Sequence, residues 1–177
     1  MATTDTNIIV GAATLEWGAY VTAAGADPTM TDAGHTNGPV KLTIDKEIVE
    51  IGSERANAPV LYIPVGMKPA IVIPAMEMTH AFMAMMLSQA SGNVSGTPPN
   101  TTMLVGDMTE AYYRVKITAR SPGANSLAVW TFYKCAPGPV GEFAFAKAAP
   151  QSPDVTFNVV RDASISAANK YFKVIYS

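Results

Sequence analysis

The segment 41–52, KLTIDKEIVEIG, constrains the fold more than any other part of the sequence, because its apolar residues change face halfway along. Successive side chains of a β-strand point to opposite faces, so a strand with one buried face is apolar at every second position. Leu42 and Ile44 follow the even numbers. Val49 and Ile51 follow the odd numbers. Such a phase change indicates a β-bulge, or a strand that leaves its own sheet for a second surface.

The next segment, 60–78, has the sequence VLYIPVGMKPAIVIPAMEM and is apolar on both faces. Lys68 and Glu77 are its charged residues. We expect two β runs that fold into a hairpin at 66–69. One domain seldom buries both faces of an antiparallel pair, so this hairpin is expected to contact another molecule.

The remaining pattern predicts a mainly β protein with one helix. Thr79 is a good N-cap for a helix over 80–91 that ends at Gly92, with an apolar face of Phe82, Met83, Met86, Leu87 and Ala90 and with Ser88, Gln89 and Ser91 toward solvent. A flexible loop is expected over 92–102. Further strands are expected within 8–17, 112–120, 127–135, 142–147, 154–162 and 170–176. The predicted fold is a β-sandwich or partial barrel with one flanking α-helix.

The strand 112–120 alternates cleanly between apolar and polar residues. Tyr113, Val115 and Ile117 form the apolar side, and the other side carries Arg114, Lys116, Thr118 and Arg120. We therefore expect a half-exposed strand with a basic outer face.

Composition favours an assembled protein over a free monomer. The chain has 177 residues, enough for one domain over 1–177, and 49% of them are hydrophobic. Charged residues make up 15%, below the roughly 25% of soluble domains, so much of the surface is expected to lie against copies or partners. The 12 basic and 14 acidic residues form no basic stripe, which argues against tight nucleic-acid binding. No apolar run suits a membrane span, and the start of the chain lacks the pattern of a targeting peptide.

The sequence offers little for catalysis or metal binding. Glu77 and His80 form an E-x-x-H pair, but carboxylate metal sites need a second such pair. His35 lies in a predicted loop, and Ser95 is one place late for a serine elbow. Cys135 ends a β run, where a buried small residue is the expected role. We expect no enzyme activity, no cofactor and no metal site.

Taken in order, several segments resemble the major tail tube proteins of long-tailed bacteriophages. They are similar, more distantly, to the tube proteins of contractile injection machines such as type VI secretion. The resemblance spans about 8–176 and rests on the segments GAATLEWGAY, GPVKLTIDKEIVEI, APVLYIPVG, PAIVIPAMEMT, PDVTFNVVRD and KYFKVIY. It implies a virion structural protein made in the host cytoplasm, whose hexameric rings share strands and stack into the tail tube. That tube would conduct DNA into the host without binding it specifically, and would contact the tape measure and tail completion proteins.

Two groups of site residues follow from this resemblance. A channel that passes DNA should avoid basic walls, so Asp45, Glu47 and Glu50 are expected to face the lumen, with Lys46 turned toward the body of the subunit. A solvated strand face is the alternative for these acids. The expected inter-subunit or inter-ring residues are Gly52, Ser53, Glu54, Arg55, Leu61, Ile63, Ile71, Ile73, Asn93, Thr97 and Asn100.

Two other classes of protein fit the sequence. The first is a different β-sandwich virion component, such as a capsid decoration or tail completion protein. The second is a monomeric ligand-binding sandwich, or an enzyme whose site the sequence does not reveal.

Overall fold

A computed structural model describes residues 13–22, 27–34, 36, 38–52, 59–75, 79–97, 100–120, 127–143, 153–165 and 171–176. The strands are β1 Ala13–Ala19, β2 Thr31–Asp32, β3 Lys41–Gly52, β4 Pro59–Pro74, β5 Val94–Thr97, β6 Asn100–Met103, β7 Tyr113–Arg120, β8 Leu127–Val140, β9 Asp154–Val159 and β10 Phe172–Tyr176. The helices are α1, His80–Met86, and a short 3-10 turn, Ser91–Asn93.

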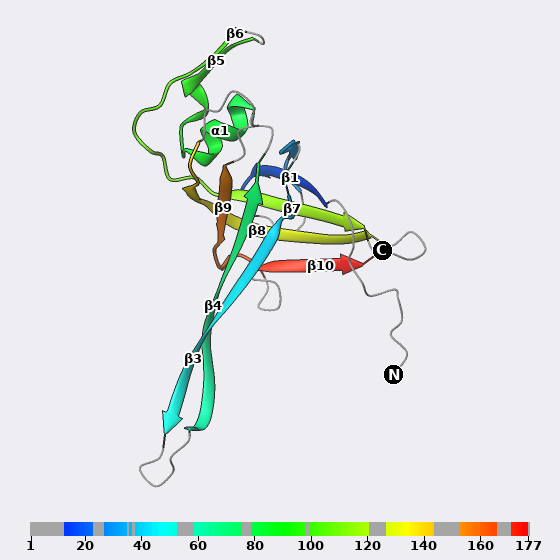
Figure 1. The fold of residues 1–177 in the computed structure, drawn as a ribbon, viewed down its shortest axis with the longest axis vertical. Helices are drawn as coiled ribbons and strands as arrows, with labels where there is room; N and C mark the ends of the chain where they lie inside the picture. The colour runs from blue at the N-terminus through cyan, green and yellow to red at the C-terminus, as the bar shows by residue number, and fades with distance from the viewer. Residues whose placement is uncertain are drawn as a thin grey trace.

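Eight of these strands form one large antiparallel sheet, in the order β2-β1-β7-β8-β9-β4-β3 with β10 also paired to β8, and β5 and β6 form a separate two-stranded sheet. The long strand β8 joins the two halves of the large sheet. The first part of β8 pairs with β7 and β10, and the part after Cys135 pairs with β9. Figure 1 shows β7, β8 and β10 crossing the direction of β9 and β4. The sheet therefore folds over itself as an open, sandwich-like β structure, and this confirms the predicted fold class.

The core lies between the two halves of the sheet. Val115 and Phe132 come from the first half, and Ile71 and Phe157 come from the second; all four side chains are fully buried in one cluster. Helix α1 adds Phe82 to the same cluster. The core is thus built from residues that are distant in sequence.

Helix α1 begins where the sequence predicts but ends early. The N–H of Phe82 donates to Oγ1 of Thr79 at 3.2 Å, which confirms the N-cap. The helix ends at Met86, and Ser88 then takes a left-handed conformation with φ 54°. This turn brings Gln89 into the interior and leaves Ala90 exposed, so the predicted faces were wrong at both positions.

Within the segment 92–102, where a flexible loop is predicted, residues 94–97 and 100–102 belong to two paired strands, and residues 98 and 99 lie outside the described residues. Strand β5 pairs with β6 from Val94 opposite Met103 to Thr97 opposite Asn100. Gly96 makes the tight return possible, since its φ is 97° and a Cβ there would lie 2.2 Å from the carbonyl oxygen of Asn100. Glycine, proline and threonine are common both in flexible loops and in short hairpins. Composition alone therefore did not distinguish the two.

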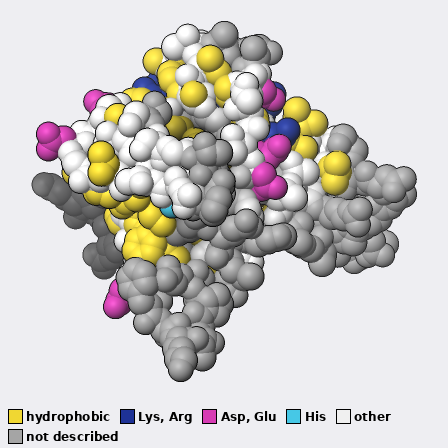
Figure 2. Space-filling view, turned by 90° about the horizontal axis from the view of Figure 1, so that it is seen from above, with side chains coloured by type: hydrophobic (Ala, Val, Ile, Leu, Met, Phe, Trp, Pro, Cys, Tyr) yellow, Lys and Arg dark blue, Asp and Glu magenta, His cyan; other side chains and the backbone are white. Residues whose placement is uncertain are grey.

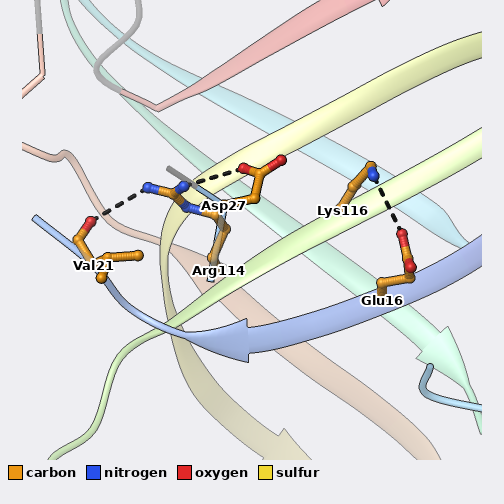
Figure 3. A network of polar contacts seen from close by, with 5 residues as sticks. All are labelled: Glu16, Val21, Asp27, Arg114 and Lys116. Atoms are coloured by element: carbon orange, nitrogen blue, oxygen red, sulfur yellow. Dashed lines mark hydrogen bonds and ion pairs between the residues drawn. The ribbon is translucent and has the colours of Figure 1, made fainter. Parts of the chain in front are cut away.

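Strand β7 does not have the uniformly exposed basic face that its alternation predicts. Arg114 is 1% exposed, and its guanidinium contacts Val21 and Asp27. One guanidinium nitrogen lies 3.2 Å from a carboxylate oxygen of Asp27, and the other donates to the carbonyl oxygen of Val21 at 3.3 Å (Figure 3). Lys116 is half-buried beside Glu16, with 3.4 Å between Nζ and Oε2 (Figure 3). The positive charges on this face are therefore used inside the subunit.

The predicted chain reversal at 66–69 was wrong, and the predicted strand 127–135 extends further than expected. Strand β4 runs without a turn through 66–69, so the hairpin is formed by β3 and β4. Strand β8 continues through 137–139 to Val140. In both strands backbone pairing with a neighbour holds the glycine and proline residues extended. Of the predicted strand 142–147, Glu142 and Phe143 are not in a strand, and 144–147 lie outside the described residues.

Candidate assembly surface

The outer parts of β3 and β4 form a two-stranded ribbon that projects from the sandwich (Figure 1). We call residues 44–52 and 59–69 the arm. Strand β4 pairs with β9 only from Ala70 to Pro74. Beyond that point the two strands of the arm are hydrogen-bonded only to each other within the described residues.

A β-bulge lies in the arm at the point where the apolar residues of β3 change face. Glu47 lies opposite Gly66, whereas the next residue, Ile48, lies opposite Pro64. Val65 is therefore the extra residue of the longer strand. Because the extra residue belongs to β4, the alternation of β3 is unbroken, and Val49 and Ile51 lie on the same face as Asp45 and Glu47. The phase change of β3 therefore corresponds to the second predicted explanation, a strand that leaves its own sheet.

Both faces of the arm are apolar and exposed. Beyond the bulge, Val49 lies opposite Ile63, and Ile51 opposite Leu61, so these four residues share one face. The other face includes Ile48 and, on β4, Pro64 and Tyr62. Eight large hydrophobic residues of the arm are each 39–55% exposed: Ile44, Ile48, Val49, Ile51, Leu61, Tyr62, Ile63 and Val65.

Such a ribbon is not a stable free surface. An isolated two-stranded hairpin is marginal in water, and a chain this size rarely exposes so much contiguous apolar surface without a partner. The arm is thus a candidate contact surface, with exposed apolar side chains on both of its faces.

The predicted interface residues fall into different environments. Leu61 and Ile63 lie on the arm and are exposed. Ile71 and Ile73 are 0% and 1% exposed in the core of the same chain, so the prediction for them was wrong: the inner part of β4 is covered by the chain's own β9 and sandwich. The sequence of β4 is equally apolar on both sides of this boundary, so it gave no sign of the difference.

The other predicted interface residues lie at the ends of short elements or outside the description. Gly52 ends β3 and Thr97 ends β5. Asn100 begins β6 and is exposed. Asn93 is half-buried and donates from Nδ2 to Oε1 of Gln89 at 3.2 Å, a contact within the chain. Ser53, Glu54 and Arg55 lie outside the described residues.

The three predicted lumen carboxylates do not share one face of β3. Strand alternation places Asp45 and Glu47 on one face and Glu50 on the other. Lys68 lies opposite Asp45, and its Nζ is 3.7 Å from Oε2 of Glu47. Lys46 lies on the face opposite Asp45 and Glu47.

A second exposed apolar segment follows β6, and the sequence gave no sign of it. Leu104, Val105 and Met108 are each more than 60% exposed. The buried Gln89 holds this segment, since its Oε1 accepts from the N–H of Gly106 at 2.9 Å. Figure 2, which views the molecule from the end that carries α1, shows hydrophobic side chains with few charged ones among them.

The residues weighed for catalysis offer no assembled site within the described ranges. No group of three or more His, Cys, Asp or Glu side chains is placed there to hold a metal ion. Cys135 is fully buried, as expected, and burial raises the pKa of its thiol. His35 and Glu77 lie outside the described residues. No described helix has the length and hydropathy that a membrane crossing requires.

The chain was compared with protein-family models, with curated proteins and with solved structures. No protein-family model matches the sequence, and no curated protein matches it. Thirteen chains of solved structures are similar. One of them belongs to a structure described as the cryo-EM structure of the anti-feeding prophage (AFP) baseplate, six-fold symmetrised. The match covers 100% of this chain and 97% of that chain. The two chains are 9% identical in sequence, and the TM-score is 0.48, so the similarity is one of fold alone.

Proposed function

We propose that this protein is a structural virion subunit that self-assembles into stacked hexameric rings. The stacked rings form the tail tube, through which DNA passes into the host. The observation that carries the proposal is the arm, whose two apolar faces and two free edges stay uncovered in a single chain. The hexameric ring and the tube are the assembly that the sequence resemblance implies.

The position of the arm supports an assembly that propagates. It projects from one side of the sandwich (Figure 1), so it meets a different surface on its partner unless two arms pair with each other. A contact between two different surfaces is heterologous, and it generates either a closed ring or an open filament. In stacked rings, the contacts within each ring close, and the contacts between rings continue as an open filament.

The charge distribution of β3 supports a passive conduit. Asp45 and Glu47 project from one face of the strand, and both are exposed. We assign these two carboxylates to the lumen wall. An acidic or neutral wall repels phosphate groups and lets DNA slide, whereas a basic wall would hold it. Glu50 lies on the other face and is left out of this assignment.

Negative-stain electron microscopy of the purified protein over a range of concentrations tests the proposal. Long tubes with a central channel are the expected result. Closed rings without tubes would favour a capsid decoration or tail completion protein. Single compact particles at every concentration would contradict self-assembly and favour a ligand-binding sandwich. Co-purification of tape measure and tail completion proteins with the tubes is expected from virions.

A further inference from the structure

The segment 104–110 is anchored to the chain through its backbone, while its large apolar side chains stay exposed. Three of its N–H groups, those of Leu104, Gly106 and Thr109, donate hydrogen bonds of 2.7–2.9 Å to the turn after α1. The acceptors are the carbonyl oxygens of Asn93 and Ser88 and Oε1 of Gln89. A loop held at three points loses little conformational entropy when a partner binds, so the segment is preorganised for a contact.

The side chains that the segment presents are apolar, with acidic residues between and beside them. Leu104, Val105 and Met108 are 63%, 64% and 81% exposed. Asp107 and Glu110 are also exposed. An exposed apolar patch rimmed by polar groups is typical of a protein–protein contact. The complementary partner is an apolar surface that carries a positive charge.

The large hydrophobic side chains that the described part of the chain exposes gather in three places. Eight lie on the arm and three on the segment 104–110. The other three are Leu127, Ile175 and Tyr176, at the start of β8 and the end of β10. Figure 1 shows the arm at one end of the longest axis, and α1, β5 and β6 at the other end. The arm and the segment therefore suit a head-to-tail contact between copies, which joins two different surfaces.

One face of the arm has the composition that this contact requires. Ile44, Lys46 and Ile48 share a face of β3, because side chains alternate along a strand. All three residues are exposed. Lys46 has no ion-pair partner among the described residues. This face thus offers two aliphatic side chains with a cation between them.

Charge selects this face over the other one. The other face carries Asp45 and Glu47, which would meet Asp107 as like charges. Glu50 shares the face of Lys46, but it lies four residues further along the strand, about 13 Å away. The contact is therefore centred on the base of the arm and not on its outer end.

We propose that the segment 104–110 of one copy binds the arm of the next copy in the stack, with its three apolar side chains against Ile44 and Ile48 and with Asp107 beside Lys46. This inference rests on the proposed function, because it names the surface that the arm contacts between rings. Each copy carries one arm and one such segment at opposite ends, so every contact leaves a free arm and a free segment and stacking continues. The other face of the arm stays available for the lumen and for contacts within a ring.

Cysteine cross-linking tests the contact directly. The sequence has one cysteine, Cys135, which is fully buried, so introduced cysteines react without interference. Equal amounts of Ile48→Cys protein and Val105→Cys protein, one of them with a short tag, are mixed, allowed to assemble and treated with a short bifunctional maleimide. A covalent dimer that contains one protein of each kind is expected.

The matched control moves the thiol to the neighbouring residue of β3. Ile48 and Val49 are 49% and 47% exposed, but they lie on opposite faces of the arm. Val49→Cys mixed with Val105→Cys is expected to give roughly tenfold less mixed dimer, because the ribbon separates the two faces. Since both thiols are equally exposed before assembly, the difference reports which face is docked.

A charge reversal tests the pairing of Lys46 with Asp107. Lys46→Glu should raise the protein concentration needed for assembly about tenfold, because it places like charges together at the contact. Adding Asp107→Lys to the same chain should return assembly to near the wild-type concentration. Lys41→Glu, an exposed position on β3 before the arm, is the control and should assemble like the wild type. A double variant that stays folded by circular dichroism and still fails to assemble would overturn the pairing.

The outcomes separate this inference from the proposed function. Tubes that form without the Ile48–Val105 cross-link, or with equal cross-linking in the Val49 control, would overturn the docking inference and leave the tube standing. Cross-linked pairs without tubes would support the docking and contradict the tube. Single particles without cross-links would contradict both.

Discussion

Val49 and Ile63 lie directly opposite each other on the arm, and in the single chain they are 47% and 39% exposed. Two aliphatic residues paired across a ribbon normally gain stability by burial against a third element. Here the described part of the chain supplies no such element. This exposed pair is the reason why we propose the arm as the surface through which copies assemble.

Ile63→Asp is expected to prevent assembly and leave the unassembled protein folded. A charge on the apolar face of the arm would have to be buried in the contact, which costs far more than leaving it in water. Size-exclusion chromatography with light scattering should show a monomer at concentrations where the wild type assembles. Thr43→Asp, at an exposed position on the inner part of β3, is the control and should assemble normally. Tubes from the Ile63→Asp variant would argue against the arm as a contact surface.

Ile71→Ala is expected to destabilise the single chain, in contrast to Leu61→Ala. Ile71 is fully buried in the core, and truncating such a residue costs about 2–5 kcal/mol. Leu61 is 51% exposed, so its truncation removes few contacts within the chain. Urea unfolding below the assembly concentration should give a much lower midpoint for Ile71→Ala alone. Equal losses in the two variants would mean that the arm is covered by its own chain in solution.

Glu47→Lys is expected to impair DNA delivery more than tube formation. The change reverses a charge on the proposed lumen wall and replaces the ion pair with Lys68 by a repulsion between two exposed groups. A basic wall attracts phosphates and should slow the passage of DNA, most strongly at low salt. Virions with this variant should have tails of normal length and reduced genome ejection. Glu50→Lys, on the other face of β3, is the comparison, and wild-type delivery by Glu47→Lys would remove the lumen assignment.

Gln89→Ala is expected to release the segment after β6. Oε1 of Gln89 accepts from the N–H of Gly106 and from Nδ2 of Asn93, so the variant loses both hydrogen bonds. One such hydrogen bond stabilises a folded protein by about 0.5–1.5 kcal/mol. Amide hydrogen exchange at Gly106 should become much faster. Unchanged protection of Gly106 in the variant would show that other contacts hold the segment.

Asp162→Asn is expected to lower stability at neutral pH and to have little effect in acid. Oδ1 of Asp162 accepts from Tyr20 Oη at 3.1 Å and from Ser164 N at 2.9 Å. Burial acts to raise the pKa of Asp162, but hydrogen bonds from Ser164 and Tyr20 and the nearby charge of Lys134 outweigh it, so the pKa is lowered.

The sign of the pH effect follows from that lowered pKa. The carboxylate stabilises the folded protein above its ordinary pKa of about 4, and this contribution is lost as the pH falls through the lower folded value. Urea unfolding should show a loss of about 1–3 kcal/mol for Asp162→Asn at pH 7, and a smaller difference at pH 3. Asp154→Asn, at an exposed position, is the control. An equal difference at both pH values would mean that the charge of Asp162 is not what stabilises this contact.

The sequence by itself determined the local features of this protein. Alternation fixed the β character of β3, β7 and β9, and the hydroxyl of Thr79 fixed the start of α1, because both depend on neighbours a few residues away. The phase change within β3 indicated a strand that leaves its own sheet. The light charge and two-faced apolar runs also pointed to a chain that contacts copies of itself.

Only the tertiary structure decided which apolar residues are covered. Ile63 and Ile71 lie on the same strand with similar side chains, yet one is exposed on the arm and the other is buried beneath β9. Arg114 occupies a position that alternation assigns to solvent, but Asp27 and Val21 bury it from a loop far away in sequence. Burial depends on where distant segments pack, and no local pattern of residues contains that information.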